Sequence, residues 1–196
     1  IANAKGVNLP KDNIDRAIKK ALDSKDEAFF QPTYEGYGPG GVAIFIETST
    51  NNTQRTVSHV RSIFNKRGGS LATSGSVSFL FERKGMFFFE LGDWDAEELE
   101  LELIDGGAEE FEVDPESNEV EVSVDFSNYG DMQKKLEELN IEVTQANLER
   151  IPTTTTELGI GEAKQVLALV EYLEDDDDVV AVFHNLEMTA ELEDEL

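Results

Sequence analysis

Three glycines in the first quarter of the chain have the spacing of a dinucleotide-binding fingerprint. Gly36, Gly38 and Gly41 match the letters G-x-G-x-x-G, whose glycines let a backbone turn approach a pyrophosphate at a helix N-terminus. That chemistry needs a strand before the motif and a helix after it. Here the apolar run over residues 42–46, which is typical of a strand, follows instead. The pattern therefore predicts a tight connection between two strands, with glycines at positive φ and Pro39 stiffening the turn.

A stripe of basic side chains is the second candidate site. Arg55, His59 and Lys66 fall at positions i, i+4 and i+11 of a predicted helix over residues 53–66 and therefore share one of its faces. Such a stripe can hold phosphates through point charges and bidentate guanidinium contacts, although an ordinary solvated helix face has the same pattern. The full set of candidate nucleic-acid-binding residues adds two arginines beside the stripe and a basic patch at the front of the chain: Lys5, Lys11, Arg16, Lys19, Lys20, Arg55, His59, Arg61, Lys66 and Arg67.

No pattern for catalysis or metal binding emerges from the remaining polar residues. His59 and His184 are the two histidines, and neither belongs to a Ser/His/Asp arrangement. The absence of Cys excludes disulfides, thiolate zinc sites and a cysteine nucleophile. The acidic run over residues 174–178 lacks the alternating acids, the glycine and the later Glu of a calcium loop. We therefore expect a protein without enzymatic activity, cofactor or metal, and we expect Trp94 to be a partly buried aromatic anchor.

The charge of the chain is strongly asymmetric. Its 42 acidic and 16 basic residues give a net charge of −26, but residues 1–84 hold 12 Lys and Arg against 8 Asp and Glu, whereas residues 85–196 hold 4 against 34. A polyanion would be repelled by the second part, so any nucleic acid must meet the first. The hydrophobic content of 39% indicates a folded protein, and its longest apolar runs are far shorter than a membrane span. With no visible targeting segment, we expect a cytoplasmic protein.

Alternating strands and helices must position these residues. The periodicity predicts helices over residues 10–24, 53–66, 95–105, 127–139 and 161–173, and strands over residues 41–48, 76–82, 86–91, 110–113, 120–124, 141–150 and 179–185. In the strand over 76–82, Val77, Phe79 and Phe81 should share one face, and Arg83 and Lys84 should mark its end. The order of the middle elements is βαββαβ, that of the ferredoxin-like unit.

The expected fold class is α+β, arranged in three modules. Residues 1–30 would be the remnant of an N-terminal helical domain, residues 31–84 plus 153–190 a discontinuous α/β domain, and residues 85–152 an inserted ferredoxin-like domain. The insertion follows from the closing helix and strand, which would complete the sheet begun at Thr33. Because the chain opens at Ile1 rather than Met, we expect a preceding segment to be absent from this sequence.

Several motifs resemble those of the YebC/PmpR family. They are YEGYGPGG at 34–41, NNTQRTV at 51–57, GGSL at 68–71 and GSVSFLF at 75–81, together with LPKDNIDRAI at 9–18, IPTT at 151–154 and FHN at 183–185. The resemblance covers essentially the whole chain and implies a three-module, cytoplasmic regulator of gene expression without enzymatic activity. The family also includes mitochondrial translational activators of cytochrome oxidase synthesis. Its members normally open with a basic helical segment beginning Gly-His-Ser-Lys-Trp, which this sequence lacks, so some contacts with nucleic acid are expected outside it.

Taken with that resemblance, the residues favour a nucleic-acid-binding regulator, in the first place a DNA-binding transcriptional regulator that contacts duplex DNA. The alternative is a ribosome-associated translation factor that binds ribosomal RNA. A protein-binding adaptor that uses the ferredoxin-like insertion is a third possibility. Because no helix is rich in Arg, Asn and Gln, backbone contacts rather than base-specific readout are expected.

Overall fold

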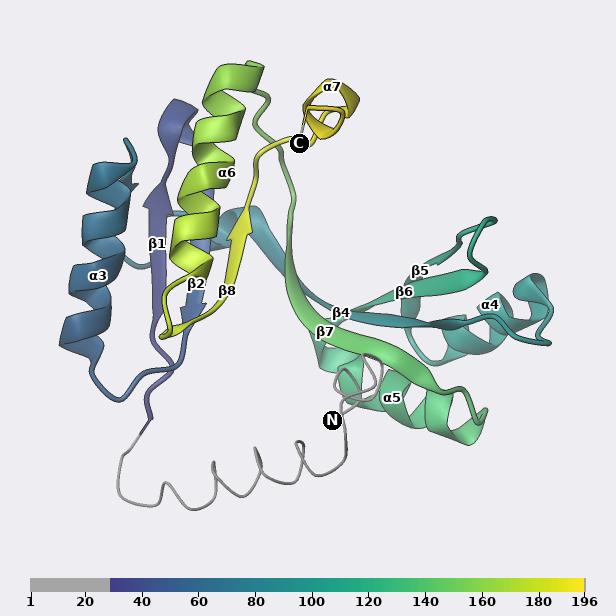
Figure 1. Cartoon of the computed structure of the whole chain (residues 1–196). Helices are drawn as coiled ribbons and strands as arrows, with labels where there is room; N and C mark the ends of the chain where they lie inside the picture. Colours follow the sequence, from purple (N-terminus) through teal and green to yellow (C-terminus); the bar gives the residue numbers. More distant parts are fainter. Residues whose placement is uncertain (1–28, 196) are drawn as a thin grey trace. The chain divides into compact units, whose positions relative to one another are not determined.

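The structure, a computed structural model, describes residues 29–195, which form two compact units (Figure 1). The flanking unit combines residues 29–82 with residues 151–195, and the central unit is Arg83–Arg150. Each unit holds a four-stranded sheet with antiparallel pairing, so the class is α+β, as predicted. The predicted helix over residues 10–24 lies outside the described residues, as do Lys5, Lys11, Arg16, Lys19 and Lys20.

The sheet of the flanking unit is assembled from two distant parts of the chain. Its strands are β1 (Thr33–Tyr37), β2 (Ala43–Thr48), β3 (Ser70–Leu71) and β8 (Val179–His184), in the order β3-β1-β2-β8. All three pairings are antiparallel, with Ile44 opposite both Gly36 and His184. The prediction that the closing strand returns to the sheet begun at Thr33 is confirmed by the pairing of β8 with β2.

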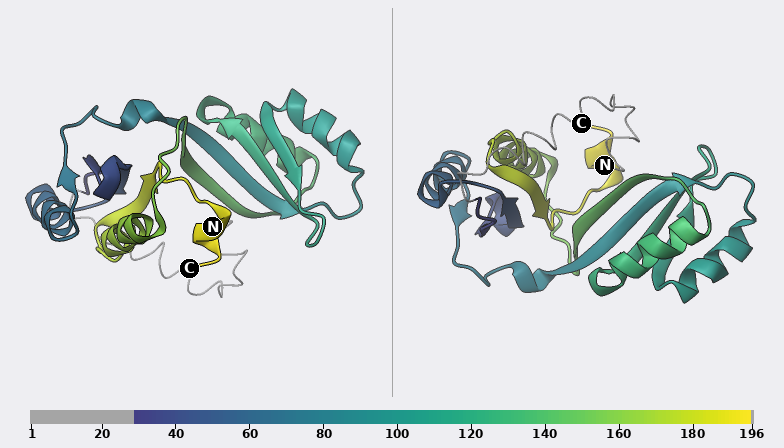
Figure 2. Two further views of the ribbon diagram at one scale, coloured as in Figure 1. Left: turned by 90° about the horizontal axis from the view of Figure 1, so that it is seen from above. Right: turned by 90° about the horizontal axis from the view of Figure 1, so that it is seen from below.

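Two helices cover one face of this sheet, α3 (Thr53–Lys66) and α6 (Ile160–Glu174), as Figures 1 and 2 show. Alternate residues of β2 point toward them, because successive side chains of a strand face opposite sides. Ile44 and Ile46 of β2, Phe64 of α3 and Leu169 of α6 are completely buried in this core. The short helix α7 (Ala190–Glu193) adds a further buried leucine.

The glycine motif forms the connection between β1 and β2, as its pattern predicted. The 3₁₀ turn η1 (Pro39–Gly41) has the two positive φ angles, 67° at Gly40 and 78° at Gly41, so of the three motif glycines only Gly41 is in the left-handed region. Gly36 instead lies inside β1, where a Cβ atom would stand 2.6 Å from Cζ of Phe64. The motif is therefore a structural turn and a close-packing site rather than a strand-to-helix phosphate loop.

The elements of the central unit are β4 (Phe81–Glu90), α4 (Ala96–Asp105), β5 (Ala108–Val113), β6 (Glu119–Asp125), α5 (Tyr129–Glu138) and β7 (Val143–Pro152). The first two residues of β4 and the last two of β7 belong to the flanking unit. Its strand order is β5-β6-β4-β7. Both helices pack on the same face of the sheet (Figure 2), burying Phe87, Leu103 and Leu136 among others. The predicted succession of strand, helix, two strands, helix and strand is confirmed.

One predicted strand is wrong. The segment over residues 76–82 forms the 3₁₀ turn η2 (Ser78–Leu80) before β4 begins at Phe81, and Arg83 and Lys84 lie inside β4 rather than at a strand end. Val77 and Phe81 are buried as expected, but the side chain of Phe79 is 72% exposed. The backbone N–H groups of this segment bind a carboxylate instead of a neighbouring strand, as described below. Among the described helices, none has the length and apolar composition to cross a membrane.

Candidate nucleic-acid interface

Helix α3 positions every candidate residue that lies within the described part of the chain. The helix begins where the side chain of Asn52 accepts a hydrogen bond from the N–H of Arg55, and it ends before Gly68, whose φ is 76°. Its buried face is formed by Thr56, Val60 and Phe64. The basic side chains project from the rest of its circumference, as the periodicity predicted.

Arg55 is tied to the flanking unit's own acidic loop. Its Nη2 lies 2.7 Å from Oδ1 and 3.0 Å from Oδ2 of Asp178, and its Nε lies 3.3 Å from Oδ2. Asp178 is only 8% exposed and also accepts a hydrogen bond of 2.7 Å from Oγ1 of Thr56. Burial raises the pKa of Asp178, but the hydrogen bonds from Arg55 and Thr56 outweigh it and hold that pKa below its usual value. Arg55 therefore anchors α3 with its charge already paired.

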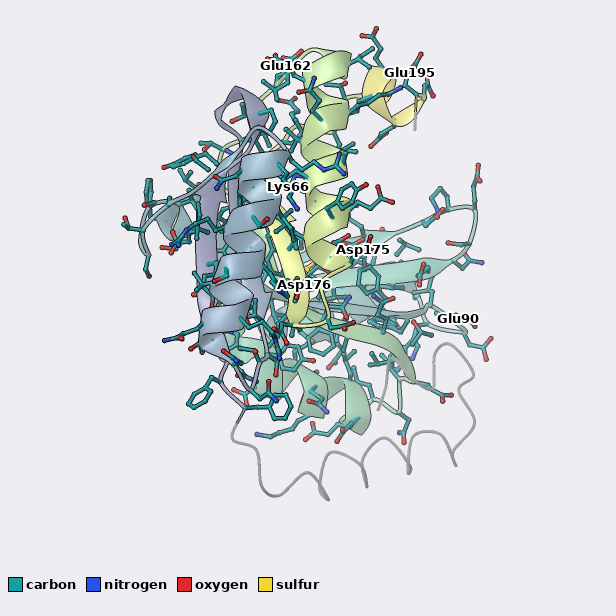
Figure 3. All side chains as sticks on the ribbon, turned by 60° about the vertical axis from the view of Figure 1, so that its left-hand side comes forward. Lys66, Glu90, Glu162, Asp175, Asp176 and Glu195 are labelled. Atoms are coloured by element: carbon teal, nitrogen blue, oxygen red, sulfur yellow. The ribbon has the colours of Figure 1, made fainter. Side chains whose placement is uncertain are left out.

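Two further members of the predicted set also face α6 or the loop that follows it. Nδ1 of His59 lies 3.2 Å from Oδ2 of Asp176, and the guanidinium carbon of Arg67 lies 3.5 Å from the ring centroid of Tyr172. Figure 3 shows Asp176 where α6 ends, with Lys66 on the last turn of α3. The acidic run over residues 174–178 thus neutralises basic residues of α3 rather than forming only a solvated boundary.

Arg61 and Lys66 remain available to a partner. Both are exposed, and within residues 29–195 neither has a carboxylate in salt-bridge range. The one other lysine or arginine of the described flanking unit, Lys164, lies 2.9 Å from a carboxylate oxygen of Glu195. Of the five candidate residues in the described part of the chain, three therefore already contact an acidic or aromatic side chain and two do not, so the five do not form one uniform basic surface.

The central unit offers a polyanion little to bind. It holds 21 acidic residues and 5 basic ones. Lys84, Lys134 and Lys135 each pair with an acidic side chain, and the guanidinium carbon of Arg83 lies 3.7 Å from the ring centroid of Phe126. No group of three potential metal ligands was found in the described residues of either unit. Long-range repulsion would keep a polyanion away from this unit.

A buried carboxylate that was not predicted from the sequence shapes the loop of the GSVSFLF motif at residues 75–81. Glu35 is 3% exposed, and its oxygens accept hydrogen bonds from the N–H groups of Gly75 at 2.7 Å, Val77 at 2.6 Å and Ser78 at 2.9 Å. Burial raises the pKa of Glu35, but these backbone hydrogen bonds outweigh it and lower the pKa. These three hydrogen bonds, which we call the Glu35 clamp, fix a loop in which the side chain of Phe79 is exposed to solvent. Thr33 and Tyr37, which share the Glu35 face of β1, are exposed, so the local pattern predicts a solvated Glu35 and gives no signal of this contact.

Comparison with known proteins gives one consistent result. Residues 29–186 match the family model described as the second and third domain of TACO1/YebC. A "Probable transcriptional regulatory protein" of Cytophaga hutchinsonii is 49% identical over 189 residues, which cover 96% of this chain and 79% of that protein. Another, from Porphyromonas gingivalis, is 48% identical over 187 residues, or 95% and 76% of the two chains.

A solved structure agrees with these relatives. The crystal structure of the conserved hypothetical protein Aq1575 from Aquifex aeolicus is similar to this chain with a TM-score of 0.77 and 37% identity. The likeness covers 95% of this chain and 77% of the other. The likeness thus extends over almost the whole chain in structure as well as in sequence.

Proposed function

The chain belongs to the TACO1/YebC family, as its motifs predicted, and we propose that it is a nucleic-acid-binding regulator of gene expression that contacts phosphates through α3. The names of its relatives support a role in transcription, so duplex DNA is the proposed partner. We propose further that it acts in the cytoplasm and by binding rather than by catalysis.

The observation that carries this proposal is the free positive charge of α3. Arg61 and Lys66 are exposed on one helix of an otherwise acidic chain, and no carboxylate of the described residues neutralises them. Lys and Arg contact phosphates through point charges and guanidinium forks, without reading bases. The front patch of Lys5, Lys11, Arg16, Lys19 and Lys20 is proposed to add further phosphate contacts.

The proposed organisation follows the same reasoning. The order β7-β4-β6-β5 with two helices on one face supports a ferredoxin-like domain over residues 85–152, inserted into a discontinuous α/β domain over residues 31–84 and 153–190.

The test is a titration of a labelled duplex DNA fragment with the 196-residue chain, followed by fluorescence anisotropy at several salt concentrations. The double variant Arg61→Glu/Lys66→Glu should weaken binding by about tenfold or more at low salt. Because each lost phosphate contact removes about 0.9 from the log–log salt slope, the slope should also fall by about 2.

The control is the double variant Lys134→Glu/Lys164→Glu, which changes the net charge equally but lies outside α3. Equal weakening by both variants would show that overall charge, rather than α3, governs binding. Sedimentation with ribosomes, with and without nuclease, then addresses the alternative partner. Cosedimentation that α3 charge reversal abolishes, together with no binding to duplex DNA, would replace the transcriptional proposal by the ribosomal one.

A further inference from the structure

The central unit has a cavity of about 550 Å³ at one end of its sheet. It is formed by the end of β4 with the turn that follows and by the turn between α5 and β7. Both turns are fixed by residues in the left-handed region, Gly92 at a φ of 60° and Asn140 at 57°. The cavity therefore belongs to the fold of this unit and lies entirely within it.

Three carboxylates line this cavity, and no basic residue lines it. Glu90, Asp93 and Glu142 contribute them, and all three are exposed residues (Figure 3 labels Glu90). Among the described residues none of the three has a salt-bridge partner, in contrast to Glu102 and Glu109 of the same unit, which pair with lysines. A concave surface lined by one sign of charge concentrates its field, so the cavity attracts cations.

An aromatic side chain in its lining distinguishes this cavity from an ordinary acidic surface. Trp94 lines it beside two aliphatic side chains, Leu91 and Ile141, and remains 37% exposed. The backbone N–H of Trp94 donates to the carbonyl of Leu91 at 3.2 Å, which fixes the turn that carries the indole. Trp is the best aromatic partner of a cation, and a desolvated cation–π contact is stronger than an exposed one.

We propose that this cavity binds the arginine or lysine side chain of a basic protein segment. The aliphatic stem of such a side chain would contact Leu91 and Ile141, and its charged head would meet the indole face and the carboxylates. Arginine suits the site best, because its planar guanidinium stacks on an aromatic ring and also forms forked hydrogen bonds with carboxylates. A nucleic acid would be repelled by the 21 acidic residues of this unit, so the inference is independent of DNA binding by α3.

The chain supplies its own probe, because Trp94 is its single tryptophan. Titrating the 196-residue protein with an acetylated, amidated pentapeptide Gly-Arg-Gly-Arg-Gly should give a saturable change in tryptophan fluorescence. The same peptide with citrulline in place of arginine keeps the shape but loses the charge, and it should bind about tenfold more weakly. Equal responses to the two peptides would overturn the proposal.

Variants of the lining residues locate the binding. The double variant Asp93→Asn/Glu142→Gln keeps Trp94 as the reporter and should weaken binding of the arginine peptide about fivefold or more. Asp131→Asn/Glu162→Gln removes the same charge at exposed positions outside the cavity and should leave the affinity within about twofold. Because all four side chains are exposed, loss of folding is not expected, and circular dichroism checks it. An unchanged affinity for the cavity variant would refute the assignment.

Discussion

The flanking unit and the central unit are both four-stranded sheets covered by two helices, yet they use carboxylates differently. In the flanking unit the two most buried acids, Glu35 and Asp178, are surrounded by donors from the backbone and from α3. In the central unit the acids lie mostly on the surface, and many face one another. The contrast is plainest on β6, where Glu121 lies directly opposite Glu112 of β5.

The pKa shifts of these groups have opposite signs. Hydrogen bonds overcome the effect of burial and lower the pKa of Glu35 and of Asp178. Burial raises the pKa of Glu121, and the neighbouring Glu112, Glu149, Glu110 and Glu119 raise it further. A carboxylate therefore stabilises this fold where donors surround it and destabilises it where other carboxylates do. The net charge of −26 does not distinguish the stabilising carboxylates from the destabilising ones.

The largest effect is expected at Asp178. The substitution Asp178→Ala leaves Thr56 and Arg55 without their shared acceptor and frees the start of α3 from the α6–β8 loop. We expect the flanking unit to lose about 2–3 kcal/mol of its free energy of unfolding, since hydrogen bonds to a buried charged group are strong. Hydrogen exchange followed by mass spectrometry measures this unit separately from the central one.

The matched control for that variant is Asp177→Ala, which removes an exposed acid one residue earlier in the same loop. It should change hydrogen exchange little. Faster exchange in the central unit rather than in α3 and β8 would contradict the role given to Asp178.

Glu35→Gln should have the next largest effect, and it depends on pH. Glutamine offers one acceptor oxygen without charge to three N–H groups, so we expect a loss of about 1.5–2 kcal/mol near pH 7. The pKa of Glu35 is lower in the folded protein than in the unfolded chain. Its stabilisation is therefore complete above the unfolded-state pKa, about 4.3, and is lost as the pH falls through the folded-state pKa.

Urea denaturation of the wild type and of Glu35→Gln over a pH series checks this expectation. The difference between the two proteins should shrink below about pH 4. Glu157→Gln, at an exposed position of the same unit, should show no such trend. A difference that stays constant from pH 7 to pH 3 would contradict the charged clamp and leave only a packing role for Glu35.

Local pattern predicted most elements of both units, because periodicity reports which face of an element is buried. The stripe of α3 and the closing strand β8 were predicted in this way. The segment over residues 76–82 was not, since its alternating Val77, Phe79 and Phe81 fit a strand equally well. The competing partner for its backbone is Glu35, which is 40 residues from Gly75 and 42 from Val77, and local pattern contains no information about such a contact.

The candidate site shows the same limit. Periodicity placed Arg55, His59 and Lys66 on one stripe, but it could not tell which of them meets an acid. Asp178 lies 123 residues from Arg55, and the pairing of β8 with β2 and the packing of α6 beside α3 bring the acidic loop to the start of α3. The sequence thus predicts which basic side chains α3 carries, whereas the tertiary fold determines which of them pair with an acidic side chain.

Glu121→Gln should have the smallest effect, and it is expected to be stabilising. Like charges directly opposite on neighbouring strands destabilise a sheet, and solvent screens this pair, so the gain should be a few tenths of a kcal/mol at pH 7. Because the folded-state pKa of Glu121 is raised, its ionisation opposes folding above that pKa. The gain in stability should therefore vanish at acid pH and decrease at high salt.

Combining Glu121→Gln with Glu112→Gln completes a double-mutant cycle. After Glu112 is neutralised, the substitution of Glu121 should stabilise the unit less. If Glu121→Gln destabilises the central unit at low salt, repulsion is not the dominant effect there. The contrast between the two units would then rest on the donors around Glu35 and Asp178 alone.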